Sequence, residues 1–352
     1  MEMALYYPKA GYYTSETNKI GGKDGDYYTS PVISSLFGEL IAKQIEEMWV
    51  LSSSKEFSIV EYGAGTGVLC KNILERLSDI SGFNKNFHYY IIEKSPSMRD
   101  IEKKSLPENV QWLDSIKDIP PFTGCVLSNE LLDNFAVHQV VMQNELMEVR
   151  VDYKDNNFTE VLEPAPEILT EYLNQLHVTL PNGFRTEINL QAINWIKDIS
   201  EVLNKGFVLT IDYGFPSQEL YSQKRRSGTL LCYSNHKIND QPFNNIGGQD
   251  ITAHVNFSAL CHWGMKNGLD YCGYTDQGHF LRGLGITEHL RKIENIAGAD
   301  QSAGQWSNQI YSLLFDMGNM LKVLIQQKGL RQTILTGLKF SGPGKNIISK
   351  LS

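Results

Sequence analysis

The chain has 352 residues and a formal net charge of −8 at pH 7, with 20% charged and 41% hydrophobic residues. This composition is typical of a globular protein, and its acidic balance argues against a general nucleic-acid-binding protein, which needs a basic surface. The lack of any apolar run of about 18 residues argues against a membrane-spanning helix, and five cysteines without C-x-x-C spacing argue against a disulfide framework or a zinc site.

Residues 1–50 are predicted to form an N-terminal lid and a helix. The opening lacks a basic or arginine-rich leader, which predicts a cytoplasmic protein, or a mitochondrial one if a leader has been trimmed. Glycine and aspartate mark residues 21–31 as a loop, and its tyrosines favour an ordered lid over a disordered tail. We expect Thr29, Ser30 and Pro31 to close over a bound ligand, with Ser30 capping the helix that Pro31 starts. An arm wrapped on the core is the alternative interpretation.

Residues 57–68 form the most informative motif, an apolar run that ends at Glu61. Three glycines follow at alternate positions, namely Gly63, Gly65 and Gly67. The pattern predicts a buried strand, a tight turn and a helix start, where backbone N–H groups can face a ligand. The spacing is not the G-x-G-x-x-G that cradles a pyrophosphate, and Glu61 would repel a diphosphate but suit the cationic aminoacyl end of S-adenosylmethionine (SAM). We therefore predict SAM as the cofactor, with a ligand-free glycine turn as the alternative.

Two further strands are predicted after this motif. Residues 88–93 end in Glu93, a carboxylate that can accept hydrogen bonds from both ribose hydroxyls at the carboxyl end of a strand. A chance polar strand end is the alternative. Residues 110–114 end in Asp114, whose side chain or backbone could meet an adenine amine.

A fourth strand, over residues 124–130, is apolar and then abruptly polar. In a methyltransferase sheet its end lies between the SAM methyl group and the substrate. We therefore expect Asn129 to lie beside the cofactor and Glu130 and Asp133 to be catalytic. A helix-capping cluster is the alternative, because Asn and Asp favour such positions.

Three stretches, residues 137–142, 146–153 and 158–162, alternate roughly at period two, and a helix is predicted before residue 180. They predict an inserted subdomain with antiparallel strands over residues 137–186. An amphipathic helix is predicted over residues 190–203. Glu187 lies near its start and is either a helix-capping residue or a substrate ligand. Residues 206–214 form another predicted strand, which ends in Asp212.

Asp250 and His254 lie four residues apart and would share one face of a helix predicted to open here. No third ligand clusters with them, so we predict no metal site. His254 is a candidate orienting group or base. From residue 287 onward the chain is predicted to be helical.

Several motifs occur in the order found in the MidA-like family, which the chain resembles from about residue 6 to residue 284. The motifs are G-D-Y-Y-T-S-P at 25–31, E-Y-G-A-G-T-G at 61–67, E-K-S-P at 93–96, N-E-L-L-D at 129–133, D-Y-G at 212–214 and D-I-T-A-H-V at 250–255. That family contains SAM-dependent methyltransferases, and its mitochondrial members methylate an arginine in a subunit of respiratory complex I and serve as assembly factors for it. The chain departs from the family pattern at Thr66, where arginine is common, and at residues 134–136.

The resemblance implies an α/β fold: a class I methyltransferase Rossmann-like sheet with an inserted α+β substrate subdomain and an N-terminal lid. The predicted divisions are 1–50 for the lid and first helix, 51–136 for the SAM-binding core, 137–186 for the inserted subdomain, 187–290 for the second half of the core with substrate-site loops, and 291–352 for a C-terminal helical region.

The function that the sequence predicts is SAM-dependent methylation of an arginine in a protein such as a complex I subunit. Carboxylates suit this task because bidentate pairing fixes the planar guanidinium. We assign this role to Glu130, Asp133, Glu187 and Asp212, with His254 orienting one of them or accepting a proton. The alternatives are a catalytically silent, SAM-binding assembly chaperone, a Rossmann oxidoreductase, and a methyltransferase for a small molecule or nucleic acid, the last disfavoured by the acidic charge.

Overall fold

The computed structural model describes residues 1–15, 29–80, 86–296, 301–331, 334–340 and 347. Most of the predicted lid, residues 16–28, therefore lies outside the described residues. Two short helices flank this gap, α1 (Glu2–Tyr6) and α2 (Ser30–Ile33). None of the helices in the described ranges is both long and apolar enough to cross a membrane.

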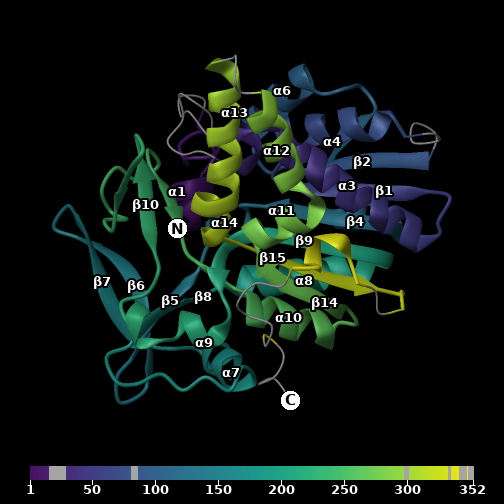
Figure 1. Cartoon of the computed structure of the whole chain (residues 1–352). Coiled ribbons are helices and arrows are strands. Elements are labelled where there is room, and N and C mark those ends of the chain that lie inside the picture. The colour runs from purple at the N-terminus through teal and green to yellow at the C-terminus, as the bar shows by residue number, and fades with distance from the viewer. Residues whose placement is uncertain (16–28, 81–85, 297–300, 332–333, 341–346, 348–352) are drawn as a thin grey trace.

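A mostly parallel sheet forms the centre of the molecule (Figure 1). Its main strands are β1 (Phe57–Tyr62), β2 (Phe87–Ile92), β3 (Val110–Leu113), β4 (Phe122–Asn129), β9 (Leu203–Phe215), β14 (Asp270–Asp276) and β15 (Leu321–Lys328). They lie in the order β14-β15-β9-β4-β1-β2-β3, and the short β13 (Val255–Asn256) pairs with β9. The strands from β3 to β9 are parallel, whereas β15 is antiparallel to both β9 and β14.

Helices cover both faces of this sheet, which explains why its strands are continuous apolar runs and do not alternate. On one face lie α3 (Ser35–Ser52) and α4 (Val68–Ser78), and on the other α8 (Leu190–Val202) and α10 (Phe257–Lys266). The chain order reverses between β1 and its neighbour β4, and such a switch point leaves a crevice at the carboxyl ends of the strands. This crevice is where the polar strand ends predicted from the sequence meet.

A second sheet stands beside the first at the left of Figure 1. Its order is β7-β6-β5-β8, formed by β5 (His138–Met142), β6 (Leu146–Lys154), β7 (Asn157–Pro164) and β8 (Arg185–Ile188). Apolar residues of one face pack against α7 (Glu167–Gln175). A third, small sheet contains β10 (Leu231–Ser234), β11 (Lys237–Asn239) and β12 (Asp250–Thr252).

The remaining helices are α6 (Pro96–Ser105), α9 (Ser217–Leu220), α11 (Gln277–Leu284), α12 (Ile286–Ile296), α13 (Gln301–Tyr311) and α14 (Met317–Met320). Two sequence expectations differ from the structure. Residues 321–328 form a strand, although helix was predicted there, because a short apolar run does not distinguish a buried strand from a helix. Asp250 and His254 lie on β12 and in the turn after it, and not on one helix face.

Gly124 and Gly206 let three central strands approach closely. A Cβ atom on Gly124 would lie 1.9 Å from the backbone oxygen of Ser58, and one on Gly206 would lie 1.9 Å from the oxygen of Gly124. Backbone atoms cannot move aside as a flexible side chain can, so neither position accepts a larger residue.

We therefore predict that Gly124→Ala lowers the free energy of unfolding by about 3 kcal/mol, the cost of overpacking a core. Gly304→Ala is the control, because a Cβ on this α13 glycine meets nothing within 4 Å. That change should raise the stability by about 0.5–1 kcal/mol through the better helix propensity of alanine. Denaturant unfolding measures both, and equal effects would contradict the packing argument.

Candidate active site

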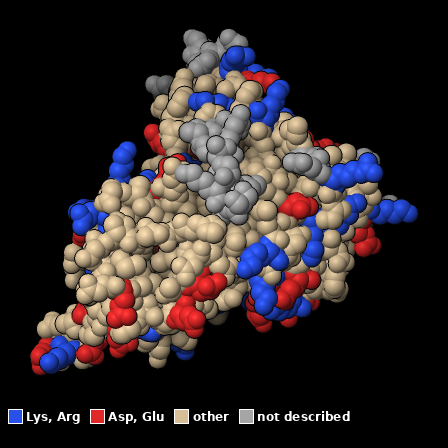
Figure 2. Space-filling view, turned by 90° about the horizontal axis from the view of Figure 1, so that it is seen from below, with Lys and Arg blue, Asp and Glu red and all other residues tan. Residues whose placement is uncertain are grey.

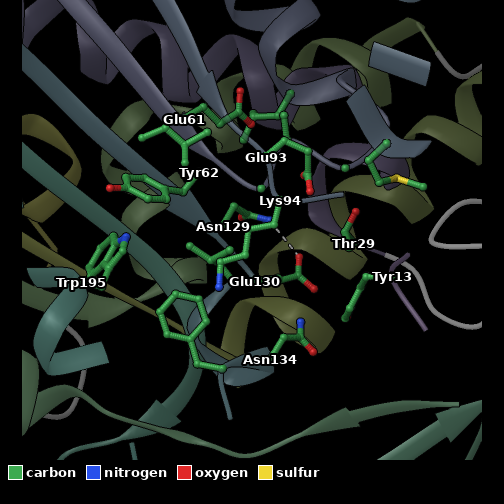
Figure 3. Close-up of a pocket in the computed structure, with 18 of the residues that line it drawn as sticks. Tyr13, Thr29, Glu61, Tyr62, Glu93, Lys94, Asn129, Glu130, Asn134 and Trp195 are labelled. Atoms are coloured by element: carbon green, nitrogen blue, oxygen red, sulfur yellow. Dashed lines mark hydrogen bonds between the residues drawn. The ribbon is translucent and has the colours of Figure 1, made fainter. Parts of the chain in front are cut away.

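Two adjoining cavities lie at the carboxyl ends of the central strands. The first has a volume of about 390 Å³, the second a volume of about 610 Å³. Glu130 and Asn134 line both of them. Figure 3 shows the first cavity, with Tyr62 and Trp195 on one side, Thr29 and Tyr13 on the other, and Glu130 between them.

The glycine turn after β1 forms one wall of the first cavity. Gly63, Gly65 and Gly67 have φ angles of 64°, 60° and 77°, a left-handed region that favours glycine. A Cβ on Gly65 would meet no protein atom within 4 Å, so this glycine leaves room for a ligand to approach the backbone. Gly63 and Gly65 line the cavity, while Gly67 caps the N-terminus of α4.

Three carboxylates predicted to bind the cofactor also line this cavity. The Tyr89 hydroxyl donates to the Glu61 carboxylate over 2.6 Å, and burial raises the pKa of Glu61 to about 7. Glu93 accepts from the Ser95 N–H at 2.7 Å, and burial raises its pKa too. The Asp114 carboxylate is exposed and pairs with Arg99 at 2.6 Å. Glu61 and Glu93 are thus the buried acidic groups of this site.

The far side of the first cavity includes Thr29, Pro31 and Asn129. Asn129 donates to Glu130 over 3.1 Å, but its buried Oδ1 atom has no hydrogen-bond partner among the described residues. Ser30 does not line the cavity. Its hydroxyl donates to Gln277 at 3.0 Å, and its N–H donates to Glu130 at 3.3 Å. The orphaned amide oxygen and the open space above Gly65 are features that a bound cofactor would fill.

The turn that carries Glu130 is held by Asp212. The buried Asp212 carboxylate accepts hydrogen bonds from the backbone N–H groups of Leu131 at 3.0 Å and Leu132 at 2.8 Å, and from that of Tyr213 at 2.8 Å. Glu130 itself has φ 51°, an uncommon conformation for a non-glycine residue, and such strain clusters at functional sites.

The second cavity is lined by carboxylates, by aromatic and aliphatic side chains, and by uncharged polar side chains, four of which come from residues 305–312. Glu130, Asp133 and Asp250 supply the carboxylates, and Tyr213, Tyr233, Ile33, Met317 and Met320 supply aromatic and aliphatic surface. Burial raises the pKa of Glu130 to about 8, and burial together with the neighbouring Asp212 charge raises that of Asp133 well above its usual value. Glu130 and Asp133 therefore favour the protonated form at neutral pH unless a cation enters.

His254 lines the second cavity as well. Burial and the nearby charges of Arg225 and Lys322 lower its pKa to about 4, so the imidazole is neutral. Its buried Nδ1 has no hydrogen-bond partner among the described residues. A neutral ring can accept a hydrogen bond or a proton from a substrate.

Glu187 and Asp212, two of the predicted catalytic carboxylates, line neither cavity. Glu187 accepts from the N–H of Thr229 at 2.8 Å and from its hydroxyl at 3.0 Å, and the same hydroxyl accepts from the N–H of His254 at 3.0 Å. We therefore propose that Glu187 positions the His254 segment and that Asp212 positions the Glu130 turn. Neither carboxylate contacts a cavity directly.

Several lining residues were missed in the sequence. Gln191, Asn194, Trp195 and Asp198 follow the i, i+3, i+4, i+7 spacing of one helix face and line the first cavity from α8. This polar and aromatic face was a usable signal. The described residues contain no group of three His, Cys, Asp or Glu side chains placed to hold a metal ion.

Comparison with known proteins gives a consistent result. A family described as "Putative S-adenosyl-L-methionine-dependent methyltransferase" matches residues 40–275. The Drosophila melanogaster protein arginine methyltransferase NDUFAF7 homolog, mitochondrial, is 26% identical over 94% of this chain and 80% of its own length. The human protein arginine methyltransferase NDUFAF7, mitochondrial, is also 26% identical, and the match covers 91% of this chain and 76% of the human protein.

Among solved structures, a Burkholderia thailandensis protein bound to S-adenosyl-homocysteine superposes with a TM-score of 0.83. It is 30% identical, and the match covers 97% of this chain and 89% of that one. A native crystal structure from the same organism gives a TM-score of 0.82 at 30% identity. These matches confirm the predicted α/β methyltransferase fold and the predicted SAM cofactor.

We predict that Gly65→Val weakens binding of S-adenosyl-homocysteine by at least tenfold, because the side chain would fill the space above the turn. Gly268→Val is the matched control. Gly268 also has a positive φ, 87°, and a Cβ added there would meet no atom within 4 Å, but this glycine lies outside both cavities. Both changes should cost about 1–2 kcal/mol of stability through backbone strain. Calorimetric titration of the two variants separates strain from lost binding, and equal affinities would contradict the assignment.

We also predict that Asp212→Asn lowers the free energy of unfolding by about 1–3 kcal/mol, because one amide oxygen cannot serve the donors that the carboxylate serves. Methyl transfer should fall as the Glu130 turn shifts, while affinity for S-adenosyl-homocysteine is kept. Thermal unfolding and titration measure the two effects. Unchanged stability and activity would show that Asp212 does not hold the turn.

Proposed function

Because this chain belongs to the family of S-adenosyl-L-methionine-dependent methyltransferases, we propose that it methylates an arginine side chain of a protein, such as a subunit of respiratory complex I. The observation that carries the proposal is the junction of the two cavities at Glu130. A cofactor-sized space opens there into a second space lined in part by carboxylates, which suits a guanidinium. The names of the curated relatives support the same substrate class.

The first cavity would hold the cofactor. Gly63 and Gly65 present backbone to it, Glu93 lies at the end of β2 where ribose hydroxyls are bound in such sheets, and Asn129 offers its unpartnered oxygen. When bound, SAM supplies an electrophilic methyl group. The residues around it exclude water, since much of the lining is apolar, including Val32, Ile92 and Leu131.

The second cavity would hold the arginine. Its guanidinium is planar and carries five N–H donors, so carboxylates at Glu130 and Asp133 can fix both its position and its rotation. The entering cation stabilises the ionised carboxylates, and the protons that they hold at neutral pH are released. The main catalytic task is to aim one nitrogen lone pair at the methyl group.

The methylated nitrogen must then lose a proton. Glu130 is placed for this step because it lines both cavities, and its pKa of about 8 lies close to neutral pH, which is favourable for a general base. Neutral His254 is a second acceptor on the wall of the arginine cavity. The nitrogen lone pair would form the new C–N bond while the C–S bond of the sulfonium breaks with its electrons kept by sulfur. S-adenosyl-homocysteine would then be the leaving group, and the proton lost from nitrogen would pass to Glu130 or His254.

The compartment of this chain remains a prediction. The curated relatives are named as mitochondrial proteins, which favours the mitochondrial option over the cytoplasmic one that the sequence analysis preferred.

The proposal is tested by mass spectrometry of methylarginine in cells with and without the gene, complemented by the wild type or by Glu130→Gln. We expect one protein to carry methylarginine only with the wild type. If the protein binds SAM but no protein loses methylarginine when the gene is removed, the catalytically silent assembly chaperone is favoured. If a small molecule is methylated, a small-molecule methyltransferase is favoured.

With the substrate identified in that way, we predict that kcat/KM rises with pH and levels off above about pH 8. The raised pKa of Glu130 keeps its carboxyl protonated below that pH, and only the ionised form can bind a guanidinium or accept its proton. Initial rates from pH 6 to 9.5 measure the profile. Glu130→Gln should lose this rising limb, and an identical limb in the variant would assign it to another group.

A further inference from the structure

The β6–β7 hairpin projects from the second sheet and is exposed along most of its length. Every residue of β7 is exposed, and β7 is the edge strand, so its outer backbone groups pair with no strand of the described chain. Such an edge can accept a strand from another chain. The hairpin contributes to neither cavity.

One face of this hairpin is mostly apolar, although Glu160 lies on it opposite Val151 and pairs with Arg185. The register places Tyr153 opposite Phe158 and Val149 opposite Leu162, so these side chains share a face. Tyr153 is 59% exposed and Phe158 43% exposed, and their rings lie 5.0 Å apart. We call Val149, Val151, Tyr153, Phe158 and Leu162 the hairpin strip. Contiguous apolar surface of this kind marks interaction sites.

The hairpin strip runs toward the second cavity. Phe158 stacks on Phe243 with ring centres 6.0 Å apart, and Phe243 belongs to the segment between β11 and β12. Ile238 of β11 lines the second cavity and is also 63% exposed. The segment that contacts Phe158 is thus flanked by two strands, β11 and β12, that both supply lining residues of the second cavity.

The same region carries most of the chain's net charge. Residues 145–171 hold eight carboxylates and two cations, a net charge of −6 out of −8 for the whole chain. Seven of the carboxylates are exposed, and Figure 2 shows acidic side chains spread over the left-hand arm of the molecule, where the hairpin and α7 lie. An apolar strip bordered by charges is the usual anatomy of a protein interface.

We propose that the hairpin strip and its carboxylate border form the docking surface for the protein substrate, which binds through a basic and apolar extended segment next to the target arginine. This inference rests on the proposed function. The charge selects the occupant: a second copy of this chain would bring the same net −6 against itself, and nucleic acids and anionic lipids are repelled. Docking at a distance from the reacting atoms contributes to KM and leaves kcat unchanged.

The test uses labelled 15-residue peptides, which extend ~25 Å on either side of a central arginine. One peptide alternates lysine and valine around a central arginine, a second has glutamate in place of lysine, and a third has alanine in place of the arginine. Fluorescence anisotropy with the full chain, saturated with S-adenosyl-homocysteine, should show tighter binding of the lysine peptide than of the glutamate peptide.

Two hairpin variants isolate the contributions. A triple variant neutralises the carboxylate border through Asp152→Asn, Asp155→Asn and Glu163→Gln. A double variant removes the aromatic part of the strip through Tyr153→Thr and Phe158→Thr. Each should weaken the lysine peptide by about tenfold, the size expected of a few exposed contacts. The control neutralises three exposed carboxylates elsewhere, through Glu56→Gln, Asp100→Asn and Glu108→Gln, and should leave the affinity unchanged. Affinity for S-adenosyl-homocysteine confirms that each variant is folded.

Two results would overturn the inference: equal binding of the lysine and glutamate peptides by the wild type, or equal losses in the hairpin and control variants. The alanine peptide separates this outcome from the proposed function. If it binds with the same dependence on the hairpin but no arginine peptide is methylated, the docking surface stands and the arginine assignment fails. If the lysine peptide is methylated with the same KM by the hairpin variants, the function stands and the docking surface fails.

Discussion

The site depends on one buried carboxyl group whose oxygens face the backbone. Asp212 accepts three N–H groups, two of them from the residues that follow Glu130. Burial raises the pKa of Asp212 to about 7. Even at the ordinary value of about 0.5–1.5 kcal/mol for each hydrogen bond, the three together offset the ~1–3 kcal/mol cost of a residue in an uncommon backbone conformation. Asp212 therefore fixes the turn in which Glu130 projects between the two cavities, and the proposed separation of cofactor space from substrate space depends on this turn.

The carboxyl ends of the parallel strands were predictable because each one combines an apolar run with an abrupt polar residue. Glu61, Glu93 and Asn129 follow this rule, and all three line the cofactor cavity. This pattern does not distinguish a polar side chain that faces a ligand from one that binds the backbone. For this reason Asp212 was predicted to hold the substrate guanidinium, although its side chain accepts hydrogen bonds from backbone N–H groups. That distinction depends on where the neighbouring turn lies, and the turn is set by tertiary structure.

The other gaps have physical causes as well. Asp250 reaches the second cavity through β12, whose strand partner among the described residues is β10, and no local pattern in the sequence specifies that pairing. Helix was predicted for residues 321–328 because the apolar positions that precede them have helical spacing. In the structure they form a strand that pairs with β9 on one side and β14 on the other, and most of its residues are buried. In both cases contacts between distant segments overrode the local preference.

The position of β15 has a consequence for biogenesis. This strand lies between β9 and β14, so it joins the edge strand β14 to the rest of the sheet although it follows both neighbours in the chain. During translation, β9 and β14 are made more than 40 residues before β15 ends, and until then each keeps an open edge that can pair with other chains. The nascent protein cannot close this part of the sheet until β15 has been made, and a chain that stops before residue 321 would leave the edge of β9 open.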